Sequence, residues 1–184
     1  MGVALNPFLC PSVDPSIAIF TPLPKIDNPA NGQQPIANSQ QPTMNILVLC
    51  TGNSCRSQMA HGYLEHFLGD RARVYSAGVE THGLNPRAIA TMMEDGIYIA
   101  HHTSNNVDEY LDIPFDYIIT VCDHANERCP YIHGKAERLH QNFVDPAKGS
   151  GTEAEIRAQF RSARDLIKTW CKEFAARVLK ELGN

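Results

Sequence analysis

The stretch Cys50-Thr-Gly-Asn-Ser-Cys-Arg56-Ser57 places a thiol and a guanidinium on either side of five small or polar residues. If this stretch forms a tight loop at the start of a helix, several backbone N–H groups point inward and the helix dipole adds partial positive charge. Gly52 removes side-chain bulk where the backbone must approach a ligand. We therefore predict a cradle for a tetrahedral oxyanion. Its expected residues are Thr51, Gly52, Asn53, Ser54, Cys55, Arg56 and Ser57.

Cys50 is the candidate nucleophile of this loop. Arg56 can hold two oxygens of an anion at once, and the same positive surroundings favour the thiolate form of Cys50, which is the form that attacks. Ser57 and Asn53 can donate hydrogen bonds that steady the thiolate and the loop. For Cys55 two interpretations stay open, because it can pack in the interior or form a resting disulfide with Cys50.

Two further cysteines, Cys122 and Cys129, are separated by six residues and follow a predicted buried strand. Together with His124 and His133 they offer four possible zinc ligands. Their spacing matches no Cys-x2-Cys knuckle, so we favour a redox pair over zinc and expect no bound metal.

The elements that must position these residues follow a rhythm of apolar runs and amphipathic segments, which predicts an α/β domain over 44–184. The run 45–50 is apolar throughout, as is typical of a strand buried on both faces of a parallel sheet. We expect helices at 57–68, ended by Gly69, and from Pro86 to Gly96, and further strands at 73–76, 116–122 and 139–143.

The last predicted element is a long amphipathic helix that begins after Thr152-x-x-Glu155, a capping-box pattern. Apolar residues recur at three- and four-residue steps: Ile156, Phe160, Ala163, Ile167, Trp170, Phe174 and Val178. Such a stripe could be a dimer seam, but we favour packing against the sheet, with Cys171 as a structural thiol.

Composition limits the remaining possibilities. The 184 residues suit one domain, and the net charge of −4 offers no broad basic surface for nucleic acid. No stretch approaches the ~20 apolar residues of a membrane span. Residues 1–43 hold 8 of the 12 prolines and no apolar periodicity, so we expect a disordered extension without a signal peptide. Six cysteines are too sparse for a disulfide scaffold, which favours a cytoplasmic protein.

From Met44 onward the sequence resembles the low-molecular-weight tyrosine phosphatase superfamily and, within it, the thioredoxin-coupled arsenate reductases. Besides the loop, the resemblance rests on Gln58-Met-Ala60, Ser76-Ala-Gly78, His82-Gly-Leu-Asn-Pro86, His102-Thr-Ser104, Val121-Cys122, Cys129-Pro130 and Asp145-Pro-Ala147. It implies a four-stranded parallel sheet flanked by helices and an activity that needs no bound cofactor.

The resemblance also implies roles for individual residues. Asp145 would be the general acid, and Cys50 would attack arsenate. Cys122 would then attack the Cys50 sulfur to release arsenite, and Cys129 would take over the disulfide for reduction by thioredoxin. If 123–128 were helical, the Cα atoms of the last two cysteines would be about 10 Å apart, too far for a disulfide. We therefore expect a marginal, rearranging turn between 122 and about 137.

Two other activities stay open. The first is a phosphomonoester hydrolase, although Ala147 and Lys148 stand where related phosphatases carry aromatic residues that hold an aryl substrate. The second is a module that binds an oxyanion or arsenite without turnover. Some relatives hold potassium beside the loop, but His61 and Asn105 replace the two carboxylates of that site, so we expect no potassium here.

Overall fold

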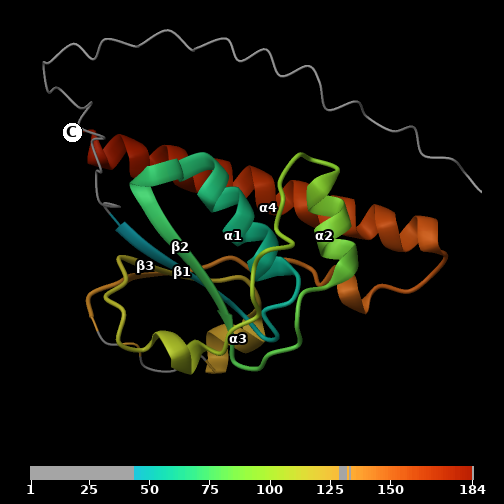
Figure 1. Cartoon of the computed structure of the whole chain (residues 1–184), viewed down its shortest axis with the longest axis horizontal. Helices are drawn as coiled ribbons and strands as arrows, with labels where there is room; N and C mark the ends of the chain where they lie inside the picture. The colour runs from blue at the N-terminus through green and yellow to red at the C-terminus, as the bar shows by residue number, and fades with distance from the viewer. Residues whose placement is uncertain (1–43, 129–131, 133, 184) are drawn as a thin grey trace, which may run out of the picture. The chain divides into compact units, whose positions relative to one another are not determined.

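The computed structural model describes residues 44–128, 132 and 134–183. The predicted extension at 1–43 and the predicted redox residue Cys129 lie outside the described residues. Four parallel strands form one sheet in the order β2-β1-β3-β4, which confirms the predicted fold class (Figure 1). The strands are β1 (Met44–Cys50), β2 (Ala72–Gly78), β3 (Tyr117–Thr120) and β4 (Glu137–His140).

The central strand β1 is buried on both faces, as its uninterrupted apolar sequence predicts. Ile46, Val48 and Cys50 belong to the core that also contains the apolar sides of α1 (Arg56–Leu68), α2 (Pro86–Met93) and α4 (Glu153–Leu182). Leu47 and Leu49 point to a second, smaller core with Val107, Phe115 and Ile132. Because β1 lies in the middle of the sheet, its carboxyl end has neighbouring strands on both sides.

The predicted helix starts agree with the structure within one residue, whereas α2 ends at Met93, three residues before the predicted stop at Gly96. The Asn85 side chain accepts a hydrogen bond from Arg87 N at the start of α2, and Gly96 adopts a positive φ of 77° after it. At the start of α4, Thr152 and Glu155 cap each other reciprocally. These signals depend on local chemistry alone, which is why the sequence marks them well.

Three strands differ from their predicted bounds by more than one residue. β2 covers Ala72–Gly78 instead of 73–76. β3 ends at Thr120 because the chain then enters α3 (Asp123–Arg128), a short helix where we expected a marginal turn. β4 covers Glu137–His140 instead of 139–143, because pairing with β3 fixes its register, with Glu137 opposite Tyr117. Phe143, which gave the predicted strand its apolar end, packs into the main core beyond β4.

The apolar stripe of α4 packs on its own domain, which confirms the favoured interpretation. Phe160, Ile167 and Cys171 are fully buried, and the Cys171 thiol faces the Ala60 carbonyl at 3.8 Å. Burial raises the pKa of Cys171, so this thiol stays protonated and structural.

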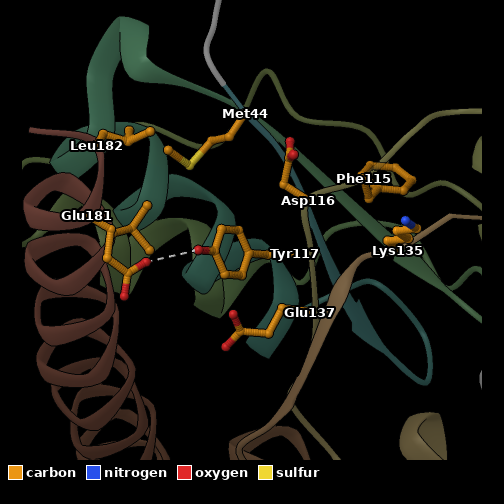
Figure 2. Close-up of a pocket in the computed structure, with 9 residues that line it drawn as sticks. Met44, Phe115, Asp116, Tyr117, Lys135, Glu137, Glu181 and Leu182 are labelled. Atoms are coloured by element: carbon orange, nitrogen blue, oxygen red, sulfur yellow. Dashed lines mark hydrogen bonds between the residues drawn. The ribbon is translucent and has the colours of Figure 1, made fainter. Parts of the chain in front are cut away.

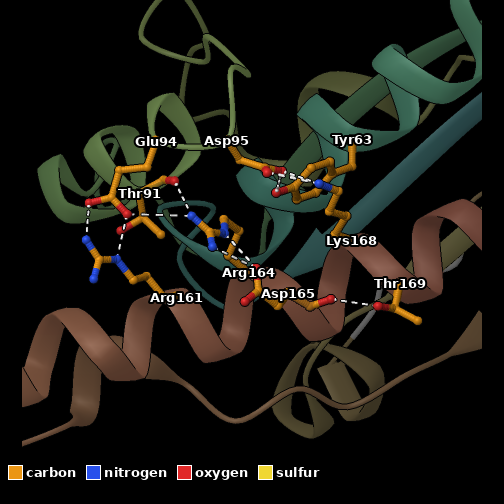
Figure 3. Close-up of polar contacts among 9 residues, drawn as sticks. All are labelled: Tyr63, Thr91, Glu94, Asp95, Arg161, Arg164, Asp165, Lys168 and Thr169. Carbon is orange, nitrogen blue, oxygen red and sulfur yellow. Dashed lines mark hydrogen bonds and ion pairs between the residues drawn. The ribbon is translucent and has the colours of Figure 1, made fainter.

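Polar contacts flank the apolar stripe and connect α4 to α1 and α2 (Figure 3). Arg161 forms an ion pair with Glu94 at 2.7 Å. Lys168 contacts Asp95 at 2.8 Å, and Asp95 also accepts a hydrogen bond from the Tyr63 hydroxyl at 2.6 Å. These contacts hold α4 against α1 and against the residues that follow α2.

In the part of the chain that the structure describes, no helix is long and apolar enough to cross a membrane.

Candidate active site

The predicted oxyanion loop connects the carboxyl end of β1 to the first turn of α1, the place where open α/β sheets bind their ligands. Each carbonyl oxygen of residues 50–55 accepts a hydrogen bond. The donors are, in order, Val79 N, Glu80 N, His82 N, Gln58 Nε2, Asn85 N and Met59 N. Because the carbonyls point to these partners, the loop can turn its N–H groups to the other side. The segment 79–85 thus acts as an outer brace of the loop.

Close packing of the backbone holds the loop in this shape. A Cβ atom on Gly78, the last residue of β2, would collide with the backbone of Glu80 and lie 2.7 Å from the Thr51 carbonyl. A Cβ atom on Gly52 would instead collide with the imidazole of His82. Asn53 adopts a φ of 43°, and its side-chain amide donates to the Ser76 carbonyl at 2.9 Å. Asn53 therefore anchors the loop to β2 and does not contact the sulfur of Cys50.

Cys50 lies at the base of the loop, with its Sγ 2.9 Å from the hydroxyl oxygen of Ser57. The same Ser57 oxygen lies 2.9 Å from Asn53 Oδ1, and both Ser57 and Asn53 are fully buried. The single hydroxyl hydrogen can serve only one of these partners at a time. With a thiol, Cys50 donates to Ser57 and Ser57 donates to Asn53. With a thiolate, Ser57 turns its hydrogen to the sulfur.

Arg56 and Asp145 meet across the loop. The guanidinium donates to Asp145 Oδ2 at 2.8 Å and to the Phe143 carbonyl at 2.9 Å, so two of its nitrogens have fixed partners. Asp145 also accepts a hydrogen bond from Ala147 N, which starts a short turn. The sequence did not reveal this pairing. It joins the predicted anion clamp and the predicted acid.

A cavity of about 490 Å³ opens above the loop. Most of the predicted site residues line it: Cys50, Thr51, Gly52, Ser54, Cys55, Arg56 and Asp145. Five other residues also line it: Glu80, His82, His124, Ala147 and Lys148. The sequence marked Ala147 and Lys148 as neighbours of the acid and His124 as a possible zinc ligand, but gave Glu80 and His82 no role in the site. Their only signal was their position shortly after β2. The described lining contains no Phe, Tyr or Trp, so an aryl group finds no aromatic wall there.

Cys122 lies at the same edge of the sheet, just after β3. Its Sγ is 3.3 Å from Thr51 Oγ1, and the same hydroxyl is 3.3 Å from His124 Nδ1. A second buried thiol therefore contacts the residue next to Cys50.

Cys55 is a free, buried thiol in the loop. Burial raises its pKa, and the nearby Asp145 and Cys50 raise it further. Cys55 therefore stays protonated at neutral pH and is a poor nucleophile.

A separate cavity of about 510 Å³ lies at the opposite end of the sheet (Figure 2). It is formed by the first residues of three strands and by the end of α4, including Met44, Tyr117, Glu137 and Glu181. Amino ends of parallel strands are not the usual ligand-binding edge. The sulfur and guanidinium chemistry gathers at the carboxyl edge.

Comparison with known proteins agrees with this geometry. The family model described as low molecular weight phosphotyrosine protein phosphatase matches residues 45–184. An arsenate reductase from Halalkalibacterium halodurans is 49% identical over 130 residues, which cover 71% of this chain and 94% of the relative. An arsenate reductase from Bacillus subtilis is 48% identical over the same shares.

Solved structures give the same relationship. A structure described as an arsenate reductase in the phosphate binding state is 29% identical, with a TM-score of 0.62, and the match covers 73% of this chain and 98% of that one. The YwlE arginine phosphatase from Geobacillus stearothermophilus is 26% identical, with a TM-score of 0.60 and coverage of 75% and 94%. The chain therefore belongs to the low molecular weight phosphotyrosine protein phosphatase family, which also contains these arsenate reductases.

Proposed function

We propose that the protein reduces arsenate to arsenite by a relay of three cysteines, with thioredoxin as the electron donor. The observation that carries this proposal is the thiol of Cys122, which contacts Thr51 directly beside the nucleophile Cys50. Hydrolysis of a phosphate ester needs one nucleophile, an anion clamp and an acid. A second thiol at the mouth of the loop gives the first one a partner for a disulfide. The 48–49% identical relatives named arsenate reductase support the same reaction.

In the first step, the Cys50 thiolate attacks the arsenic of arsenate held by the loop N–H groups and Arg56. An As–S bond forms, and one arsenic–oxygen bond breaks. Asp145 protonates the oxygen that leaves, so it departs as water or hydroxide. The Arg56 guanidinium has five N–H donors, and its contacts with Asp145 and the Phe143 carbonyl use two of them, so it can hold the anion and the acid together.

In the second step, the Cys122 thiolate attacks the Cys50 sulfur. The electron pair of the S–As bond passes to arsenic, which leaves as arsenite while a Cys50–Cys122 disulfide forms. Cys129 then attacks Cys122 and releases Cys50 as thiolate. The dithiol of thioredoxin supplies the two electrons that reduce the Cys122–Cys129 disulfide.

The last exchange requires α3 to change shape. A helical segment over Asp123–Arg128 sets its flanking residues about 10 Å apart, whereas the Cα atoms of a disulfide are 4.4–6.8 Å apart. Of the six residues of α3, only Ala125 is buried. Unwinding this helix therefore exposes little apolar surface, which makes it a suitable element to move.

The deciding experiment measures NADPH oxidation driven by arsenate in the presence of thioredoxin and its reductase. We expect turnover by the full chain, none by Cys122→Ser, and none by Cys50→Ser. Cys171→Ala, which changes a buried thiol far from the loop chemistry, should keep turnover. Stoichiometric arsenate binding without turnover would refute the reductase and favour a binding module.

A second assay separates reduction from ester hydrolysis, the other activity of this family. Hydrolysis of a small aryl phosphate uses Cys50, Arg56 and Asp145 without the shuttle thiols. We expect Cys122→Ser to keep whatever hydrolysis the wild type has. Equal loss of both activities in Cys122→Ser would contradict the relay. A relay that depends on reduced thiols and on thioredoxin suits the cytoplasm, and we propose that location.

A further inference from the structure

A cluster of three side chains lies behind the active loop, outside the cavity described above. His61 and Glu65 are one turn apart on α1, and His102 comes from the segment that follows α2. Ligand atoms of all three lie within 4.8 Å of one another. His61 Nε2 is 3.3 Å from one Glu65 oxygen, and His102 Nε2 is 3.4 Å from the other.

The hydrogen bonds of Gln58 fix the tautomer of His102. Gln58 Nε2 donates to Asn53 Oδ1 at 2.9 Å and to the Thr103 carbonyl at 2.9 Å, and neither oxygen can donate in return. The amide therefore presents its oxygen to His102, where Gln58 Oε1 is 3.0 Å from Nδ1. Nδ1 must carry the hydrogen. In neutral His102, Nε2 then carries a lone pair.

That lone pair has no partner. The side chain of His102 is only 4% exposed, and its Nε2 has no hydrogen-bond partner among the described residues. The nearest polar group is the Glu65 carboxylate, which offers further lone pairs. Buried polar atoms are nearly always satisfied, so a positive charge, either a proton on Nε2 or a metal ion, belongs between these groups.

We propose that His61, Glu65 and His102 form a binding site for one divalent first-row transition metal of the Zn²⁺ type. Two imidazoles and one carboxylate are a common donor set for such ions, whereas Ca²⁺ and Mg²⁺ prefer oxygen alone. With metal–ligand distances of 2.0–2.1 Å, tetrahedral ligands are about 3.3 Å apart. Each Nε2 lies 3.3 or 3.4 Å from one oxygen of the Glu65 carboxylate, and one ligand atom from each residue lies within 4.8 Å of the others, so small side-chain movements would bring all three to one ion.

The surroundings of the cluster also suit a metal. Metal-binding histidines usually anchor their other ring nitrogen to a polar group. His102 Nδ1 is anchored on Gln58, and His61 Nδ1 lies 3.0 Å from Ser76 Oγ. The two rings stack with centroids 4.2 Å apart, and both Nε2 atoms face the Glu65 carboxylate. Glu65 is 47% exposed, which leaves a path for the ion and room for a water as fourth ligand.

The site is independent of the proposed arsenate chemistry, so its test measures binding alone. The background is the full chain carrying Cys50→Ser, Cys122→Ser and Cys129→Ser, which removes thiols that would bind zinc themselves. Chelator-treated protein is titrated with Zn²⁺ by calorimetry and with Co²⁺ by visible absorption. We expect one ion per chain and cobalt bands without a thiolate charge-transfer feature.

Single changes within the cluster assign the ligands. We expect Glu65→Gln and His102→Gln each to weaken Zn²⁺ binding by at least about tenfold. His66→Gln, an exposed histidine next to Glu65 on the same helix, is the matched control and should bind as the background does. If His102→Gln fails to fold, Glu65→Gln still decides, because that side chain is half exposed.

Three results would overturn the site. The first is no stoichiometric binding of either ion. The second is binding that neither Glu65→Gln nor His102→Gln weakens. The third is a cobalt spectrum dominated by thiolate charge transfer, which would place the ion on a remaining cysteine.

Discussion

Replacing Gly78 with alanine is expected to damage the active loop from outside it. The added Cβ would meet only backbone: the Glu80 carbonyl, the Thr51 carbonyl at 2.7 Å and Asn53 N at 2.9 Å. Backbone atoms cannot swing aside as a side chain can, so strand and loop must separate. Overpacking of this kind costs typically 1–3 kcal/mol, and we expect about 3 kcal/mol here. A loop displaced by about 1 Å also loses about 100-fold in rate.

Gly52→Ala is the matched comparison, because its Cβ would meet the imidazole of His82 instead of backbone. That side chain is 57% exposed and can rotate away. We expect Gly52→Ala to cost about 1 kcal/mol and the double variant Gly52→Ala/His82→Ala to recover most of it. Urea unfolding gives the stabilities, and thioredoxin-coupled arsenate turnover gives kcat/KM. A Gly78→Ala protein with wild-type stability and kcat/KM would refute the brace formed by residues 79–85.

Three further outcomes test separate parts of the structure. Ser57→Ala removes the hydroxyl 2.9 Å from Cys50 Sγ, so alkylation of Cys50 by iodoacetamide at pH 7 should slow about tenfold, an effect that peptide mapping can assign to this residue. Hydrogen bonds from Lys168 and then Tyr63 lower the pKa of Asp95, so this carboxylate stabilises the fold above its unfolded pKa of about 3.9 and loses that contribution as the pH falls through the lower folded value. Urea titrations of Asp95→Asn should therefore show a deficit of about 1 kcal/mol at pH 7 that shrinks below pH 4, and a deficit that grows on acidification would contradict the assignment. Thr152→Ala should lower the free energy of unfolding by about 1 kcal/mol through loss of the α4 cap, and an unchanged thermal midpoint would argue against that cap.

The sequence predicted those parts of the candidate site that depend only on residues close together in the chain. The loop after β1 could be recognised because a buried strand, small residues and a helix start follow one another without a gap. β4 was misplaced because an edge strand takes its register from its neighbour and shows no apolar run of its own. The contact between Arg56 and Asp145 joins residues 89 positions apart, and no local pattern reports such a distance.

The histidine cluster also depends on contacts between residues that are far apart in the sequence. From the sequence alone, His61 stands where some relatives carry a carboxylate of a potassium site, and we expect no metal there. Glu65, one turn further along α1, places a carboxylate on the same helix face. His102 comes from a segment 41 positions after His61. Only the folded chain brings these donors within 4.8 Å.

A directed chain of hydrogen bonds connects the cluster to the nucleophile. The Nδ1 hydrogen of His102 goes to Gln58 Oε1, and the Gln58 amide donates to Asn53 Oδ1. When Cys50 becomes a thiolate, Ser57 turns its hydrogen from Asn53 to the sulfur. Asn53 Oδ1 still keeps the Gln58 N–H as its donor at that moment. Deprotonation of the nucleophile therefore leaves both the thiolate sulfur and Asn53 Oδ1 with a hydrogen-bond donor, so neither of these buried acceptors is unsatisfied.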